Sequence, residues 1–179
     1  MIDDLLNFWF SDPSKKRWFN STKQFDNEIH QKYGALWQQG RDSQLDHWQD
    51  SAEGCLALII LFDQLPLNMF RGKTDSFATE ALSRDVARIA IQQGFDKKLP
   101  PEQQSFVYMP FMHSELPVDQ DLSVQYFSGT GLEGSLRFAR HHREIVQKFG
   151  RFPHRNEILG RVSSEDELAY LNSKEGFQG

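Results

Sequence analysis

An unbroken apolar run at residues 55–62, CLALIILF, constrains the fold more than any other feature of this sequence. A helix built from such a run has no polar face, so neighbouring elements must cover most of its surface. The run is far shorter than the roughly 18 residues that suggest a membrane span. Pro66 is predicted to end the helix, because proline lacks the backbone N–H that continues the hydrogen-bond ladder. The chain is therefore predicted to fold around a buried helix at about residues 51–65.

Helical spacing also marks the segments on either side of this run. Ile29, Tyr33 and Trp37 lie on one face of a helix that is predicted to start near Asp26, as an N-cap, and to end at Gly40. Further helices are predicted at residues 3–10, 76–93, 102–115, 117–128, 132–149 and 164–171, with caps at Ser76 and Ser164 and a kink at Pro110. No stretch shows the apolar alternation and hairpin turns of a β-sheet. We predict an all-α fold of stacked antiparallel helical hairpins, forming one domain over residues 1–179.

Charge and composition narrow the class of protein. The net charge of −5 and the pI near 5.7 argue against nucleic acid as a partner, because phosphate binding needs a surplus of Lys and Arg. The chain begins MIDD, which lacks the basic and apolar regions of a secretory signal. The single cysteine, Cys55, excludes an intrachain disulfide. We expect a cytoplasmic protein that does not cross a membrane.

Four groups of polar residues could carry a function. The first follows the apolar run and consists of Asp63, Gln64, Asn68 and Arg71. These side chains either satisfy backbone groups and pair locally around Pro66, or present a carboxylate, amides and a guanidinium to a ligand. The sequence leaves both interpretations open.

The second and third groups contain histidines. His113 and Glu115 are two residues apart, so a joint role requires the helix to unwind between the flanking prolines. In the helix predicted at residues 132–149, His142 shares a stripe with Phe138, Ile145 and Phe149. His142 is therefore predicted to point inward, where a buried imidazole needs polar partners, whereas His141 lies at the margin of the stripe.

The fourth group follows Gly150 and consists of Arg151, His154, Arg155 and Asn156. Arg151 could simply complement the dipole of the preceding helix. The cationic groups also lie close together beside Phe152 and Pro153, which is typical of an anion-binding loop. No Gly-rich phosphate loop, Cys-x-x-Cys, His-Glu-x-x-His or Gly-x-Ser-x-Gly motif is present, and neither a cofactor nor a metal is predicted.

Four stretches together resemble a known bacterial family: LALIILFDQLP at 56–66, NMFRG at 68–72, PFMHSE at 110–115 and FGRFPHRN at 149–156. The similarity extends from residues 8–10 to residues 159–167, and the last of the four motifs is specific. The chain resembles domain-of-unknown-function family 924, which is grouped with tetratricopeptide-like helical folds. The resemblance implies a tetratricopeptide-like right-handed array of hairpins and no established activity.

The positions that match this family are Asp63, Gln64, Asn68, Arg71, His113, Glu115, Gln120, His142, Arg151, His154, Arg155, Asn156 and Arg161. One position departs from it, because Leu67 stands where the family pattern implies an arginine. If that arginine contacts a ligand in relatives, this protein binds a different ligand or binds it less tightly.

Three functions stay open. The favoured one is a binding domain whose His-, Arg- and Glu-lined polar pocket takes a small anionic ligand or a peptide carboxylate. One alternative is a hydrolase, metal-dependent or acid/base, that uses His113, Glu115, His142 and His154. The other is a protein-interaction scaffold in which the polar residues only fix the helix packing. The sequence identifies no catalytic residue and no oligomeric state.

Overall fold

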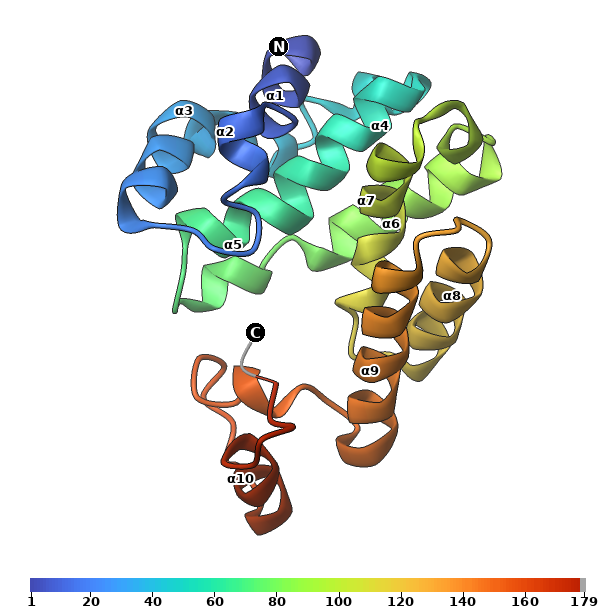
Figure 1. The fold of residues 1–179 in the computed structure, drawn as a ribbon. Helices are drawn as coiled ribbons and strands as arrows, with labels where there is room; N and C mark the ends of the chain where they lie inside the picture. The colour runs from blue at the N-terminus through green and yellow to red at the C-terminus, as the bar shows by residue number, and fades with distance from the viewer. Residues whose placement is uncertain (178–179) are drawn as a thin grey trace. The chain divides into compact units, whose positions relative to one another are not determined.

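The computed structural model describes residues 1–177, and every regular element in that range is helical (Figure 1). The all-α fold class is therefore confirmed, while a tetratricopeptide-like arrangement stays a prediction. The helices are α1 (Ile2–Trp9), α2 (Asp12–Lys15), α3 (Lys23–Arg41), α4 (Ala52–Ile59), α5 (Leu65–Met69), α6 (Glu80–Gln92), α7 (Pro101–Met112), α8 (Pro117–Ser128), α9 (Glu133–Phe149) and α10 (Glu165–Leu171). Short 3-10 turns and one π-helical turn, η2 (Ile60–Gln64), complete the chain.

The chain forms two compact units. Unit 1 comprises Met1–Arg71 and Asp75–Pro110, and unit 2 comprises Gly72–Thr74 and the residues from Phe111 onward. The boundary falls inside α7, so one continuous helix contributes residues to both units. The single domain predicted for residues 1–179 requires that the two units unfold together.

Unit 1 is built around the predicted apolar helix, but that helix does not end at Pro66. Instead α4 continues through η2 into α5, so residues 52–69 are helical throughout. Pro66 cannot donate to the Phe62 carbonyl, and the hydroxyl of Thr79 donates to it instead, at 2.7 Å. The helix widens into a π turn at this place. The prediction that Pro66 ends the helix is wrong, because a side chain from another segment supplies the missing donor.

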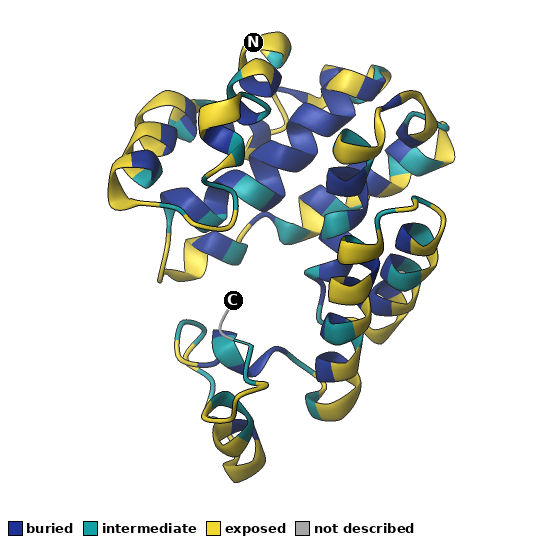
Figure 2. Ribbon diagram, in the orientation of Figure 1, coloured by how far each residue is buried: buried dark blue, intermediate teal, exposed yellow. Residues whose placement is uncertain are grey.

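The long central helix is a core element. The stretch Ala52–Met69 is long and apolar enough to cross a membrane, with a mean hydropathy of 1.3, but 83% of it is buried inside the protein. Helices α1 and α6 pack against α4, and α3 packs against α5. Figure 2 shows α4 as buried along most of its length. Such burial is typical of the core helix of a soluble protein.

Two helix starts in unit 1 differ from the prediction. Thr22 caps α3, so Asp26 lies in the first turn of the helix instead of capping it. Ser76 is buried but does not cap α6, which begins at Glu80 after a short 3-10 turn. The buried face of α6 carries Ser83, Val86, Ala87 and Ala90, while Leu82 is 39% exposed.

Unit 2 contains the hairpin of α8 and α9, which pack side by side (Figure 1). Helix α9 ends at Gly150, whose φ of 71° is the left-handed conformation that glycine adopts at least cost. Ile145 and Val146 of α9 pack with Phe152 in a small core. This core fixes the start of the loop at residues 150–163 against α9, and the predicted capping box of Ser164 opens α10 after that loop.

Candidate functional site

The predicted site residues fall into two groups, one in each compact unit. Unit 1 holds Asp63, Gln64, Asn68 and Arg71, and unit 2 holds His113, Glu115, His142, Arg151, His154, Arg155 and Asn156. The two groups differ in kind. The first is dominated by pairing within the protein, and the second contains a cluster of imidazole rings.

The group in unit 1 is centred on Asp26. Its carboxylate accepts hydrogen bonds from Ser21 Oγ at 2.6 Å, Asn68 Nδ2 at 2.7 Å and Arg71 Nε at 2.8 Å. Burial raises the pKa of Asp26, but these donors outweigh burial, and the pKa lies below its ordinary value. Asn68 and Arg71 thus pair within the protein, but with Asp26 of α3 and not locally around Pro66. Asp26 itself was not predicted as a site residue, because it lies 45 residues from Arg71 and resembles an N-cap.

Asp63 and Gln64 lie in the π turn η2. Asp63 is only 3% exposed, and Gln64 Nε2 donates to its carboxylate. The same amide lies 3.6 Å from the sulfur of Met109. These two predicted residues therefore interact with each other at the widened part of the central helix.

In unit 2, Glu115 ties the end of α7 to the loop at residues 150–163. Arg161 donates to both carboxylate oxygens, at 2.7 and 2.9 Å, and the backbone N–H of Phe152 donates at 2.8 Å. Burial raises the pKa of Glu115, yet the hydrogen bonds from Arg161 and Phe152 bring it below its ordinary value. Glu115 is therefore an ionised anchor, and Arg161, which matches the family motif, is its partner.

Arg151 has a structural partner as well. Its Nε and Nη2 donate to the two oxygens of Glu167, at 2.7 and 2.8 Å, and Nη2 also donates to the Val162 carbonyl at 2.9 Å. The hydrogen bond from Arg151 is the main cause that lowers the pKa of Glu167 to about 2. Glu167 also completes the capping box of α10. Local spacing does not place Glu167 beside Arg151, because the two residues are 16 positions apart.

Three histidines of unit 2 lie together around two phenylalanine rings. We name the set His113, His142, His154, Phe152 and Phe177 the imidazole cluster. The ring centre of His142 lies 6.4 Å from that of His113 and 5.5 Å from that of Phe152. The ring of His154 lies 5.7 Å from Phe152. Phe177 packs against both His142 and His154, at 4.7 and 5.0 Å. The structure thus brings together the three histidines that the sequence singled out.

The prediction that His142 points inward is confirmed, since the residue is 6% exposed. Its Nδ1 lies 2.9 Å from the Phe138 carbonyl, which can only accept a hydrogen bond, so the proton is on Nδ1. Nε2 is then the acceptor of the neutral ring. Phe138, predicted on the same stripe, is 52% exposed, because the buried face of α9 turns toward Ala139.

The imidazoles of His142 and His154 are held neutral. Burial is the main cause that lowers the pKa of His142 to about 3 and that of His154 to about 4. The positive charge of Arg155 lowers both values further. Arg155 is itself buried, and its guanidinium carbon lies 4.7 Å from the centre of the Phe152 ring. A buried cation therefore lies beside neutral rings at physiological pH.

One polar atom of the cluster has no partner. Nδ1 of His154 is buried and has no hydrogen-bond partner among residues 1–177. Leaving such an atom unsatisfied costs about 1–3 kcal/mol. Across the same residues, no three His, Cys, Asp or Glu side chains are grouped so that they could hold a metal ion. His113, Glu115, His142 and His154 therefore do not converge as a set of metal ligands.

The amide nitrogens of Asn156 and Gln120 in unit 2 have structural partners. Asn156 is buried, and its Nδ2 donates to Ser163 Oγ at 3.0 Å. Gln120 donates to the carbonyls of Met112 and Ser114, at 2.7 and 2.6 Å. Both side chains satisfy groups at the ends of local turns and position the segments that carry the cluster.

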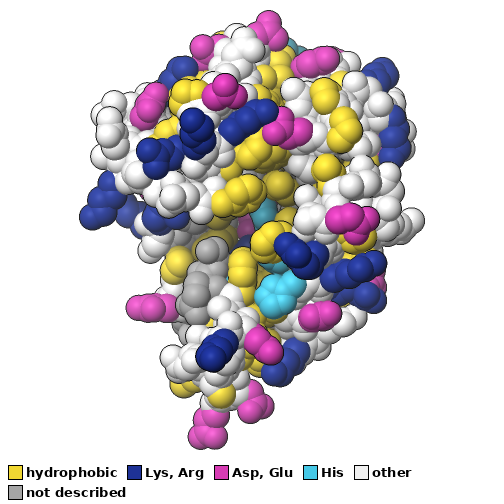
Figure 3. All heavy atoms as spheres, viewed as in Figure 1, with side chains coloured by type: hydrophobic (Ala, Val, Ile, Leu, Met, Phe, Trp, Pro, Cys, Tyr) yellow, Lys and Arg dark blue, Asp and Glu magenta, His cyan; other side chains and the backbone are white. Residues whose placement is uncertain are grey.

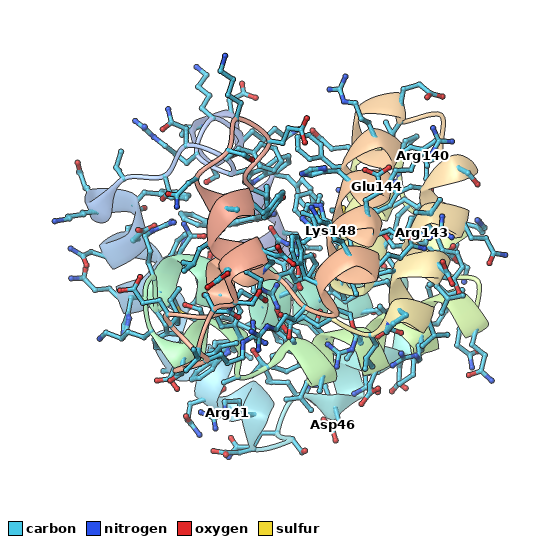
Figure 4. All side chains as sticks on the ribbon, turned by 90° about the horizontal axis from the view of Figure 1, so that it is seen from below. Arg41, Asp46, Arg140, Arg143, Glu144 and Lys148 are labelled. Atoms are coloured by element: carbon cyan, nitrogen blue, oxygen red, sulfur yellow. The ribbon has the colours of Figure 1, made fainter. Side chains whose placement is uncertain are left out.

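The outer surface of α9 is charged. Figure 4 shows Arg140, Arg143, Glu144 and Lys148 along this helix, and Figure 3 shows Lys, Arg and His side chains beside acidic ones on one face of the molecule. Arg143 pairs with Asp121 of α8 at 2.6 Å. Because charges of both signs alternate here, this surface does not form a uniform anion-binding stripe.

The comparisons with known proteins agree with the resemblance seen in the sequence. The chain is similar to a solved protein of unknown function, ATU0120 from Agrobacterium tumefaciens, with 36% identity, a TM-score of 0.91 and 96% of each chain covered. No curated protein matches it. The model of a family described as bacterial protein of unknown function, DUF924, matches residues 5–175. The chain therefore belongs to the DUF924 family.

Proposed function

We propose that this protein is a binding domain for a small anionic ligand or a peptide carboxylate, and that the imidazole cluster of unit 2 is its site. The observation that carries the proposal is the unsatisfied, buried Nδ1 of His154 in a cluster in which the imidazoles of His142 and His154 are neutral. Buried polar atoms almost always have a partner, and a ligand is one way to provide it. We also propose that the protein is cytoplasmic. We propose that it does not bind nucleic acid, because its net charge is −5.

The preference for an anion comes from the charge around the cluster. The field of Arg155 reaches both His142 and His154, since it lowers the pKa of each ring. The nearby carboxylates of Glu115 and Glu167 are each bound by an arginine through both oxygens. An incoming carboxylate would be stabilised by the buried guanidinium charge of Arg155 and by a proton on Nδ1 of His154.

The hydrolase alternative receives less support from the same geometry. Glu115 has a lowered pKa, and both of its oxygens already accept hydrogen bonds. A carboxylate in this state is a poor general acid or base near neutral pH. The scaffold alternative is favoured by the Glu115–Arg161 and Arg151–Glu167 pairs, which fix packing without any ligand. In a binding domain, these two ion pairs would hold the loop at residues 150–163 so that the imidazole cluster keeps its geometry.

The test is calorimetric titration of the full chain at pH 7 with acetate, with inorganic phosphate and with the neutral control acetamide. We expect saturable binding of at least one of the two anions and a loss of about tenfold to a hundredfold in affinity in His154→Ala, because a hydrogen bond to a charged group is removed. The matched control is His47→Ala, which changes an exposed histidine of unit 1 and should bind like the natural protein.

Thermal unfolding of each variant separates binding from folding. If His154→Ala does not fold, His154→Leu fills more of the space of the imidazole and likewise has no hydrogen-bond donor. Failure of both anions to bind the natural protein would contradict the proposal. Equal affinity of the natural protein and a folded His154 variant would contradict it as well. A His154 variant that unfolds while no anion binds would favour the scaffold alternative.

A further inference from the structure

The segment that follows α10 folds back onto the imidazole cluster. Gly176 N–H donates to the Ser173 carbonyl at 3.2 Å, and Phe177 N–H donates to the Tyr170 hydroxyl at 3.1 Å. This turn directs the Phe177 ring onto His142 and His154. The plane of the Phe177 ring is inclined at 65° to that of His142 and at 85° to that of His154. The edge-to-face arrangement is the one that aromatic rings favour electrostatically.

The fold-back depends on a glycine. A Cβ atom at Gly176 would lie 2.6 Å from the Tyr170 carbonyl oxygen and 2.7 Å from that of Leu171. Both are backbone atoms, which cannot move aside as the end of a flexible side chain could. Any other residue at this position would therefore push the segment away from α10 and carry the Phe177 ring with it.

The segment that covers the cluster is itself exposed to solvent over most of its length. Residues 173–175 are exposed, and Phe177 itself is only partly buried. The contacts that hold the Phe177 ring are with the histidines and with the small core of Ile145, Val146 and Phe152. A ring of a ligand that makes the same contacts and one additional polar interaction can displace the Phe177 ring.

We propose that Phe177 is an internal occupant of the imidazole cluster and that the ligand which displaces it is a small aryl carboxylate. The aromatic ring of the ligand would take the edge-to-face position of Phe177 against His142 and His154. Its carboxylate would meet the unsatisfied Nδ1 of His154 and the charge of Arg155. This inference rests on the proposed anion-binding function and specifies the class of ligand.

The experiment compares phenylacetate, cyclohexylacetate and acetate as ligands of the full chain at pH 7. If the closed segment reduces the population of open sites to about one tenth, Phe177→Ala should bind phenylacetate about tenfold more tightly than the natural protein. Phenylacetate should also bind more tightly than cyclohexylacetate, which has a ring of similar size without aromatic edges and faces. Acetate, which cannot use the ring position, should bind more weakly than both.

Two control pairs make the result specific. Phe138→Ala removes an exposed phenylalanine of α9 that lies outside the cluster, and should leave every affinity unchanged. Gly176→Ala should reproduce the gain seen in Phe177→Ala, because it lifts the ring without deleting it. Gly134→Ala, at a position with open space around the added Cβ, should have no effect on binding.

The outcomes separate this inference from the proposal on which it rests. If no anion binds the natural protein or Phe177→Ala, the binding function itself is overturned. If acetate or phosphate binds with dependence on His154, but Phe177→Ala and Gly176→Ala leave phenylacetate binding unchanged, the binding function stands and the role of Phe177 is overturned. Equal affinities for phenylacetate and cyclohexylacetate would overturn the aromatic class of the ligand.

Discussion

The pKa of a buried histidine depends on the loss of solvation and on the groups that the imidazole contacts. His142 keeps its Nδ1 proton on the Phe138 carbonyl, and burial holds its pKa at about 3. The unfolded chain has no such constraint and takes up a proton near pH 6.5. The folded protein therefore loses stability as the pH falls from about 6.5 toward about 3, because the unfolded state binds the proton first.

We expect this histidine to contribute about 2 kcal/mol to the loss of stability between pH 7 and pH 5. The variant His142→Gln should reduce the pH dependence of the free energy of unfolding, measured with urea, by that amount. His47→Gln, the same change at an exposed position, should keep the full dependence. A slope that is identical in His142→Gln and in the natural protein would show that His142 is not held neutral.

Local patterns in the sequence predict where helices form, but they predict poorly which residues the side chains of those helices contact. The apolar run and the helical spacing predicted a buried central helix, and the stripe on α9 predicted the direction of His142. These patterns could not predict that the central helix continues through Pro66. The Phe62 carbonyl, which Pro66 cannot reach with an N–H, is bound by the hydroxyl of Thr79, 17 residues further along the chain. The partners of Glu115 and Asp26 lie 46 and 45 residues away, and local spacing carries no signal over such distances.

The π turn gives a prediction at the scale of the element. Thr79 accepts from Trp37 Nε1 at 3.1 Å and donates to the Phe62 carbonyl, so its hydroxyl satisfies two buried groups. Thr79→Val has nearly the same shape but leaves both groups unsatisfied, and should destabilise the protein by about 2–4 kcal/mol in urea unfolding. Thr74→Val, at an exposed position, should change the stability by less than about 0.5 kcal/mol. Equal stability of the two variants would mean that the hydroxyl of Thr79 does not support the turn.

At the scale of the whole molecule, the two compact units raise the question of cooperativity. All four tryptophans, Trp9, Trp18, Trp37 and Trp48, lie in unit 1. Tryptophan fluorescence therefore reports on unit 1, whereas far-ultraviolet circular dichroism reports on the helices of both units. Helix α7 contributes residues to both, and its continuity would link their unfolding.

We predict that the two signals will give the same urea midpoint and the same slope, as expected for one cooperative domain over residues 1–179. A fluorescence transition that is separated from the dichroism transition would instead show that the units unfold independently. In that case, Thr79→Val should shift the fluorescence transition and the part of the dichroism change that accompanies it, and leave the remaining dichroism transition unchanged, since Thr79 lies in unit 1.

The central claim is that the imidazole cluster receives an anion through His154. The most direct measurement is nuclear magnetic resonance of the histidine ring nitrogens in the full chain at pH 7 during a titration with acetate. The account predicts a saturable shift of the His154 Nδ1 resonance, with the resonances of the exposed His47 unchanged. A His154 resonance that does not move, or one that moves no more than that of His47, would contradict it.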